Sequence, residues 1–281
     1  MKRLLFLVPA LILVYLALPA GWSGGPISLA AFDEEGNVIH IVNFDTEAGT
    51  VTDVAVPGNT QVEVANNLGT WPLSAAWELG KKEGYGGRLL ADTITRSLKF
   101  PVGGWGEGEI ISLSEGGLSA ITAVFASPGS STIRAKDRLR LAIFSVSAPL
   151  RRINLEETGY LKEGTITGGD RGYVIRAKMP LSLASVFAQK KVVEEGTKIK
   201  IINESGSASA QYVAGTASVL GAQVASVLDG PPADYDCRIE ASEDSATAKA
   251  LSEVFGCARA SSRDLPDQVL FYLGKGFSGR F

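Results

Sequence analysis

The pattern of apolar and charged residues sets the N-terminus apart from the rest of the chain. Lys2 and Arg3 precede an uncharged, mostly apolar run from Leu4 to Ala20. A run of this length is near the short end of the roughly 17–25 residues that cross a bilayer. Cations before it favour an extracytoplasmic location for everything that follows. We therefore expect residues 1–25 to form a single-pass membrane anchor and spacer. A cleaved signal peptide is the alternative, although the run ends in a poor cleavage site.

Residues 26–196 mix the periodicities of strands and helices. Alternating apolar residues in Val38–Phe44 and Thr50–Val56 flank a turn that ends in Gly49, which predicts a β-hairpin. Apolar residues at helical spacing then predict two helices. One runs from Leu73 to a stop at Gly80, and the other ends near Leu98, before a proline.

The remainder of this stretch alternates between the two types of element. We expect strand and turn over 111–129, a helix over 130–149 capped by Ser130, Ser131 or Thr132, a Gly-Gly turn that feeds a strand over 165–180, and one helix over 181–196. The charged end of the last helix is the best domain boundary in the sequence.

Residues 197–281 carry a more regular pattern. Strands are predicted at Lys198–Asn203, Ala222–Leu228, Asp236–Ala241, Cys257–Ala260 and Val269–Leu273. Apolar stripes that end at Gly221 and Gly256 predict helices after the first and third of these strands. The result is a β-α-β-β-α-β module, so we expect an α/β protein in which a larger mixed-sheet domain precedes a smaller one.

Composition narrows the possible functions. The 281 residues are 45% hydrophobic and 20% charged, with a net charge of −3, so no basic excess indicates a nucleic-acid partner. The single histidine, His40, excludes a multi-histidine metal site and a Ser-His-Asp triad elsewhere. Its place in an alternating run predicts a surface position on a strand.

Both cysteines, Cys237 and Cys257, lie in the C-terminal module. They begin the strands on either side of the second helix, and a right-handed crossover could make those strands neighbours. In an oxidising compartment the pair could form a disulfide, whereas two buried thiols would behave as small apolar side chains. The sequence leaves both readings open.

A turn that opens a helix, Glu204–Ser207, has the outline of a phosphate-binding loop. A P-loop requires a Gly-Lys-Ser/Thr end, and a dinucleotide fold requires three glycines. This turn has no lysine and one glycine, and Glu204 places a negative charge where a phosphate would bind. The sequence therefore indicates a scaffold and no nucleotide site.

Short motifs carry a resemblance to known envelope proteins. "IKIINESGSASAQYVAGTASVLG", "ATAKALSEVFGC" and "VLFYLGKGF" together resemble the LytR C-terminal domain over about Lys198–Phe277. That module commonly follows a LytR-CpsA-Psr (LCP) domain, and about Pro26–Trp105 resembles the hairpin and following helices of that domain. The resemblance implies an LCP-like domain over 26–196 and a LytR C-terminal domain over 197–281.

The LCP resemblance implies transfer of polyprenyl-pyrophosphate-linked glycopolymers to the wall, with arginines on the pyrophosphate and aspartates that organise Mg²⁺. At the position of the family's Pro-Arg-Asp motif this chain has Pro57-Gly58-Asn59, and an upstream arm is shortened to Phe32–Gly36. Pyrophosphate transfer needs positive charge and a metal. No catalytic residue carries over, and we expect a degenerate relative that binds or scaffolds, with no cofactor and with wall glycan or envelope proteins as partners.

The alternative is an active Mg²⁺-dependent phosphotransferase with a relocated site. Arg88, Asp92 and Arg96 share a helical spacing that could hold phosphate and a metal, and Arg134 and Arg138 belong to a second cationic helix. These five are the candidate ligand-binding residues. A solvated helix face with i,i+4 ion pairs is the simpler interpretation of each set.

Overall fold

The computed structural model describes residue 22 and residues 24–125, 131–263, 265 and 267–281. The expected anchor, Leu4–Ala20, lies outside the described residues. Within the described part of the chain, no helix is both long and apolar enough to cross a membrane.

A five-stranded sheet forms the centre of the N-terminal half, in the order β6-β1-β2-β3-β7. Its strands are β1 (Ile27–Asp33), β2 (Val38–Asp45), β3 (Thr50–Pro57), β6 (Gly104–Trp105) and β7 (Leu150–Asn154). The first three pair antiparallel, and β6 and β7 add parallel strands at the edges. The predicted hairpin is confirmed. His40 does not stand free on its surface, because its Nδ1 lies 3.0 Å from the buried carboxylate of Asp53.

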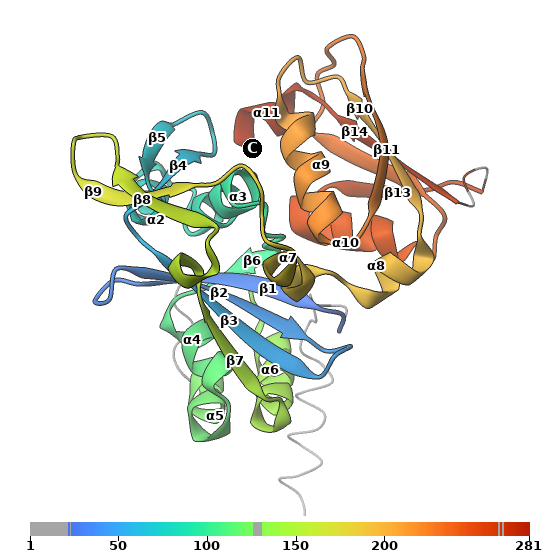
Figure 1. The fold of residues 1–281 in the computed structure, drawn as a ribbon. Helices are drawn as coiled ribbons and strands as arrows, with labels where there is room; N and C mark the ends of the chain where they lie inside the picture. The colour runs from blue at the N-terminus through green and yellow to red at the C-terminus, as the bar shows by residue number, and fades with distance from the viewer. Residues whose placement is uncertain (1–21, 23, 126–130, 264, 266) are drawn as a thin grey trace, which may run out of the picture.

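Both faces of this sheet are covered, because successive side chains of a strand point to opposite sides. Helices α2 (Leu73–Glu83) and α3 (Arg88–Ser97) pack on the face that carries Ile39, Ile41 and Val54. Helices α4 (Gly108–Glu115), α5 (Gly117–Phe125) and α6 (Ala135–Ser147) cover the face that carries Leu29, Val42 and Phe44. Figure 1 shows α4–α6 on the side of the sheet away from the C-terminal module.

A smaller four-stranded sheet, in the order β5-β4-β9-β8, extends from the same half. It contains β4 (Thr60–Val64), β5 (Gly69–Pro72), β8 (Leu161–Thr165) and β9 (Arg171–Ile175), and the short 3₁₀ helix η1 (Leu155–Thr158) precedes β8. Gly168 and Gly169, both with positive φ, form the predicted turn before β9.

The third sheet has the order β11-β10-β14-β12-β13 and its own apolar core. It contains β10 (Lys198–Asn203), β11 (Gln223–Asp229), β12 (Cys237–Ala241), β13 (Ala258–Ser261) and β14 (Gln268–Leu273), with helices α7 (Leu181–Phe187), α8 (Lys190–Glu195), α9 (Ser209–Val219), α10 (Ala246–Phe255) and α11 (Lys275–Arg280) before, between and after the strands. The α/β class and the order of elements in the module are confirmed. The boundaries at residues 25 and 196 stay predictions.

Several local predictions are wrong. Residues 111–125 belong mostly to helices α4 and α5, where strand and turn were expected, because the apolar residues face the sheet at helical spacing, as Leu113 and Ala120 do. Helix α2 continues past Gly80 to a left-handed C-cap at Gly84. Residues 181–196 form two helices instead of one, the α6 N-cap is Arg134, and α11 was not predicted.

Candidate ligand-binding cleft

Helix α3 is enclosed on nearly every side, so its polar side chains must find partners within the protein. All residues from Leu89 to Arg96 are buried. Strands of the central sheet and strand β4 of the smaller sheet lie on one side of the helix. Helix α9 lies on another side, where Thr216 Oγ1 donates to the carbonyl of Thr95 at 3.1 Å. The helix thus lies between the N-terminal half and the C-terminal module.

At the start of α3, Arg88 and Asp92 form the i,i+4 ion pair that their spacing predicts, with Nε of Arg88 2.9 Å from Oδ2 of Asp92. The expectation of a solvated face is wrong for this pair, since the Asp92 side chain is only 8% exposed. Burial raises the pKa of the Asp92 carboxyl, while the charges of Arg88 and Arg280 oppose the rise. Burial therefore disfavours the charged form of this carboxyl, and Arg88 offsets part of that cost.

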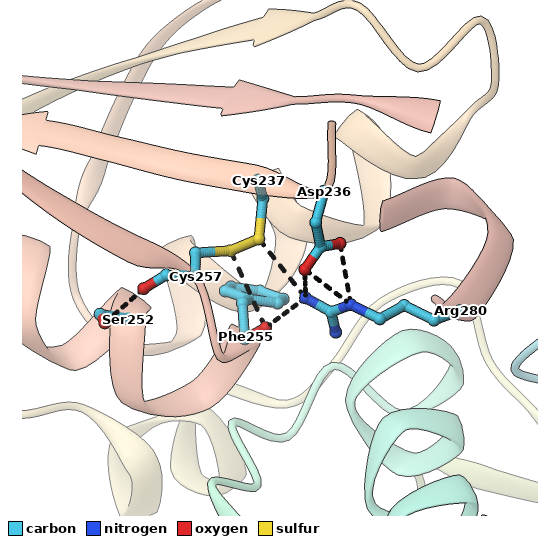
Figure 2. Close-up of a disulfide and its surroundings, with 6 residues drawn as sticks. All are labelled: Asp236, Cys237, Ser252, Phe255, Cys257 and Arg280. Carbon is cyan, nitrogen blue, oxygen red and sulfur yellow. Dashed lines mark hydrogen bonds and ion pairs between the residues drawn. A yellow bond between two sulfur atoms is a disulfide. The ribbon is translucent and has the colours of Figure 1, made fainter. Parts of the chain in front are cut away.

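The C-terminal module contributes a second ion pair beside the first. Arg280 of α11 binds the Asp236 carboxylate through both Nε and Nη2, at 2.9 and 3.0 Å (Figure 2). The same Nη2 donates to the carbonyl of Phe255 at 2.8 Å and approaches Cys237 Sγ at 3.4 Å. These contacts hold the Arg280 guanidinium at the start of β12.

The two ion pairs line one cleft of about 330 Å³. We call it the paired-charge cleft, and its lining residues are Asn66, Tyr85, Arg88, Leu89, Asp92, Asp236, Gly256 and Arg280. Sequence analysis missed Asn66, Tyr85, Asp236 and Arg280, because nothing in the sequence links them to Arg88 across such separations. Of these four residues, Asp236 alone has a local signal in the sequence, because it directly precedes Cys237.

Arg96 does not reach this cleft, since it lies two turns further along α3. Its side chain is 8% exposed, and it forms an ion pair with Glu63 and donates to the backbone oxygen of Phe281 at 2.6 Å. Its guanidinium also lies 4.8 Å from the ring centre of Tyr212. Arg96 therefore joins β4, α9 and α11, and its role in the fold is structural.

Arg134 and Arg138 are on α6, against the opposite face of the central sheet from Arg88 and Asp92. Arg134 is exposed at the N-cap of the helix, whereas Arg138 is buried, as is the adjacent Asp137. A fully solvated helix face was expected here, and for Arg138 this is wrong. The five candidate residues thus occupy three separate places, and their role in binding stays a prediction.

The corner at Pro57-Gly58-Asn59 has no room for a larger side chain at position 58. Gly58 donates its backbone N–H to the carbonyl of Asn37 at 2.8 Å, and a Cβ at position 58 would lie 2.7 Å from that carbonyl oxygen. Asn59 donates to the backbone of Arg171 and lines an open hollow of about 490 Å³ beside β8 and β9.

The described residues contain no group of three or more His, Cys, Asp or Glu side chains arranged to hold a metal ion. In the paired-charge cleft, each aspartate is already bonded to an arginine. Mg²⁺ prefers several oxygen ligands in near-octahedral geometry, and these side chains do not fit it.

Cys237 and Cys257 form a disulfide, with their Cα atoms 5.2 Å apart. Strands β12 and β13 lie side by side and parallel, as a crossover through α10 requires. The disulfide is next to the paired-charge cleft, because Asp236 and Gly256 are the neighbours of the two cysteines in sequence.

The cleft has the chemistry of a site for a polar, uncharged ligand. Its two arginines and two aspartates carry no net charge as a set, which disfavours a free pyrophosphate. Carboxylates and guanidinium groups offer acceptors and donors to hydroxyl groups, and Tyr85, 48% exposed, offers an aromatic ring beside them.

No protein-family model matches the chain, and no curated protein sequence matches it. Solved structures with similarity to this chain include LCP proteins, all with TM-scores below 0.5. TagV of B. subtilis superimposes with a TM-score of 0.42 at 12% identity, covering 59% of this chain and 95% of TagV. YwtF (TagT) with bound octaprenyl pyrophosphate lipid gives 0.41 at 14% identity, covering 59% and 90%. TagT bound to LIIa-WTA gives 0.38 at 15% identity, covering 54% and 84%.

Proposed function

We propose that this chain is a membrane-anchored, extracytoplasmic envelope protein that binds a sugar unit of a wall glycopolymer in the paired-charge cleft and transfers nothing. It would act in glycopolymer assembly by holding or presenting the glycan. The resemblance of its sequence to the LCP and LytR C-terminal modules supports a location in the cell envelope and a role in glycopolymer assembly. The chemistry of the cleft supports the ligand class.

The observation that carries the proposal is the pairing of each cleft arginine with an aspartate. An arginine that must grip a pyrophosphate needs free N–H donors and a net positive surrounding. Here Nε and Nη2 of Arg280 are bonded to Asp236 and to the Phe255 carbonyl, and Nε of Arg88 is bonded to Asp92, so an aspartate offsets the charge of each arginine. The remaining lone pairs of the aspartates, with the Tyr85 ring, fit sugar hydroxyls and a sugar's apolar face.

The closed corner at Gly58 supports the same conclusion. An arginine cannot enter there while the turn between β1 and β2 holds its position, because that turn occupies the space of the side chain. The place where the resemblance implies a phosphate-binding arginine is therefore filled by the protein itself.

Binding of the purified chain to solubilised wall glycan, measured by calorimetry, tests the proposal. Tyr85→Ala should weaken binding by about two- to tenfold, since an aromatic contact contributes ~0.5–1.5 kcal/mol. Trp71→Ala is the matched control, because Trp71 is also an aromatic that is 48% exposed but lies outside the cleft. Absence of binding, or equal loss in both variants, would contradict the proposal.

A Mg²⁺-dependent transfer assay with a polyprenyl-pyrophosphate-linked glycopolymer tests the alternative function. Turnover that disappears in Arg88→Ala and persists in Arg152→Ala would replace our proposal with the phosphotransferase.

A further inference from the structure

Helices α5 and α6 expose apolar side chains on the side that faces away from the central sheet. Leu118 and Ile121 on α5 are 76% and 47% exposed, and Ile143 and Val146 on α6 are 64% and 52% exposed. The opposite sides of the same helices bury Ala120, Ala123, Leu141 and Ala142 against the sheet. We call the four exposed residues the α5–α6 apolar patch.

The four side chains belong to one end of the helix pair. Gly116, directly before α5, approaches the end of α6 so closely that a Cβ there would lie 2.5 Å from the carbonyl oxygen of Ser145. The first turn of α5 is thus beside the last turn of α6. Leu118 and Val146, each in one of these turns, belong to the same end of the molecule.

The two chain segments that carry the patch contain no charge, and the ion pair between Glu115 and Arg152 lies at their border. No Asp, Glu, Lys or Arg lies between Glu115 and Arg134, or between Arg140 and Arg151. Single exposed apolar residues are ordinary on soluble proteins, but a contiguous uncharged group is typical of an interaction surface.

The chain leading to the expected anchor begins on the same helix. The backbone N–H of Trp22 donates to Asp137 Oδ2 at 3.1 Å, and its carbonyl accepts from Arg140 Nη1 at 3.4 Å. The apolar run ends at Ala20, two residues earlier, and two residues span at most ~7 Å. Ile143 is three positions after Arg140 on the helix, a rise of ~4.5 Å.

We propose that the α5–α6 apolar patch rests in the interfacial region of the bilayer and orients the molecule on the membrane. The inference depends on the proposed anchor, because the short connection through Trp22 is what keeps α6 near the lipid. Isolated interfacial helices bind membranes through an apolar face of this kind. Here the anchor keeps the patch at a high local concentration next to the lipid.

The orientation has a consequence for the paired-charge cleft. Helix α3 is on the opposite face of the central sheet from α5 and α6, and Figure 1 shows the C-terminal module on that side. With the patch on the bilayer, the cleft opens away from the membrane, toward the wall.

Depth-dependent fluorescence quenching in the full-length chain tests this orientation. The protein is reconstituted into vesicles of equal parts phosphatidylethanolamine and phosphatidylglycerol that contain doxyl-labelled lipids. Because Cys237 and Cys257 are joined, one introduced cysteine is the one thiol available for an environment-sensitive dye. The variants are Leu118→Cys and Ile143→Cys in the patch and Leu181→Cys, 84% exposed on α7, as the matched control.

Lipid quenching of the two patch dyes should exceed that of the Leu181→Cys dye by about threefold or more, because an interfacial helix buries its apolar face ~5–10 Å into the acyl boundary. Adding Val146→Glu should reduce quenching at Leu118→Cys while the protein stays with the vesicles. Equal quenching at all three positions would overturn the inference, as would a blue-shifted patch dye that lipid does not quench, which would indicate a second copy of the chain. Protein that fails to float with the vesicles would overturn the anchor itself, whereas loss of glycan binding alone would leave the orientation intact.

Discussion

Gly58 and Asn37 are in direct contact: the Gly58 N–H donates to the Asn37 carbonyl at 2.8 Å, and a Cβ on Gly58 would lie 2.2 Å from Asn37 Oδ1. Asn37 itself has a φ of 49°, which lets the turn between β1 and β2 close tightly. The shortened turn and the glycine thus fit together as one unit. This contact leaves no room for a side chain at position 58.

Replacing Gly58 with alanine should destabilise the protein by about 1–3 kcal/mol, because the added carbon has no room between two oxygens of Asn37. Gly58→Arg should cost at least as much. Urea unfolding measures the change, and Gly108→Ala is the control, since a Cβ there meets nothing within 4 Å. Asn37→Ala should not rescue Gly58→Ala, because the backbone carbonyl remains. An unchanged urea midpoint for Gly58→Ala would show that the turn moves aside freely.

Arg96→Ala should lower the free energy of unfolding by about 2–3 kcal/mol, since it removes charged hydrogen bonds from a buried guanidinium and leaves the Phe281 oxygen without its donor. The matched control is Arg152→Ala. Arg152 is 64% exposed and pairs with Glu115 at 3.5 Å, and exposed pairs contribute roughly 0–1 kcal/mol. Equal effects of the two substitutions in chemical denaturation would contradict a bridging role for Arg96.

Opening the disulfide should cost about 3 kcal/mol, because the two cysteines are separated by 20 residues and the bond restricts the unfolded chain. The double variant Cys237→Ser/Cys257→Ser and the reduced wild-type protein should show the same loss in urea unfolding. Figure 2 shows the Arg280 guanidinium in contact with both Asp236 and the disulfide sulfur of Cys237, so we also expect weaker glycan binding after reduction. Full stability in reductant would contradict this prediction.

The stability difference between the wild-type protein and Asp92→Asn should depend on pH. Burial raises the pKa of Asp92 in the folded state above its ordinary value of 3.8, so the folded chain holds the proton more tightly than the unfolded chain. Its favourable contribution is fully present below the unfolded pKa and is lost as the pH rises through the folded pKa. The wild-type protein should therefore gain stability relative to Asp92→Asn as the pH falls from neutral toward 4.

Urea unfolding across this pH range measures that difference. Asp234→Asn is the control, because the Asp234 side chain is 84% exposed. A difference that is flat in pH, or that shrinks on acidification, would show that the ion pair with Arg88 outweighs burial.

Strand and helix periodicity predicted most of the C-terminal module correctly, including β10 residue for residue. It failed over 111–125, where a run with many apolar residues and one charge, Glu115, suits a strand as well as a helix. The helix forms there because a one-sided apolar surface of the sheet, with Leu29 and Phe44, needs covering. Packing against the apolar face of the sheet thus outweighs the local preference of this segment for a strand.

By itself, the sequence determined the α/β class, the hairpin and the pairing of Arg88 with Asp92, since each follows from residues near one another in the chain. Only the tertiary structure decided that Asp236 and Arg280 join Arg88 and Asp92 in one cleft, that Arg96 is a buried bridge, and that the cysteines are bonded. Those contacts join residues far apart in sequence. The free-energy cost of leaving one of these charges unpaired depends on its burial, which only the tertiary structure sets.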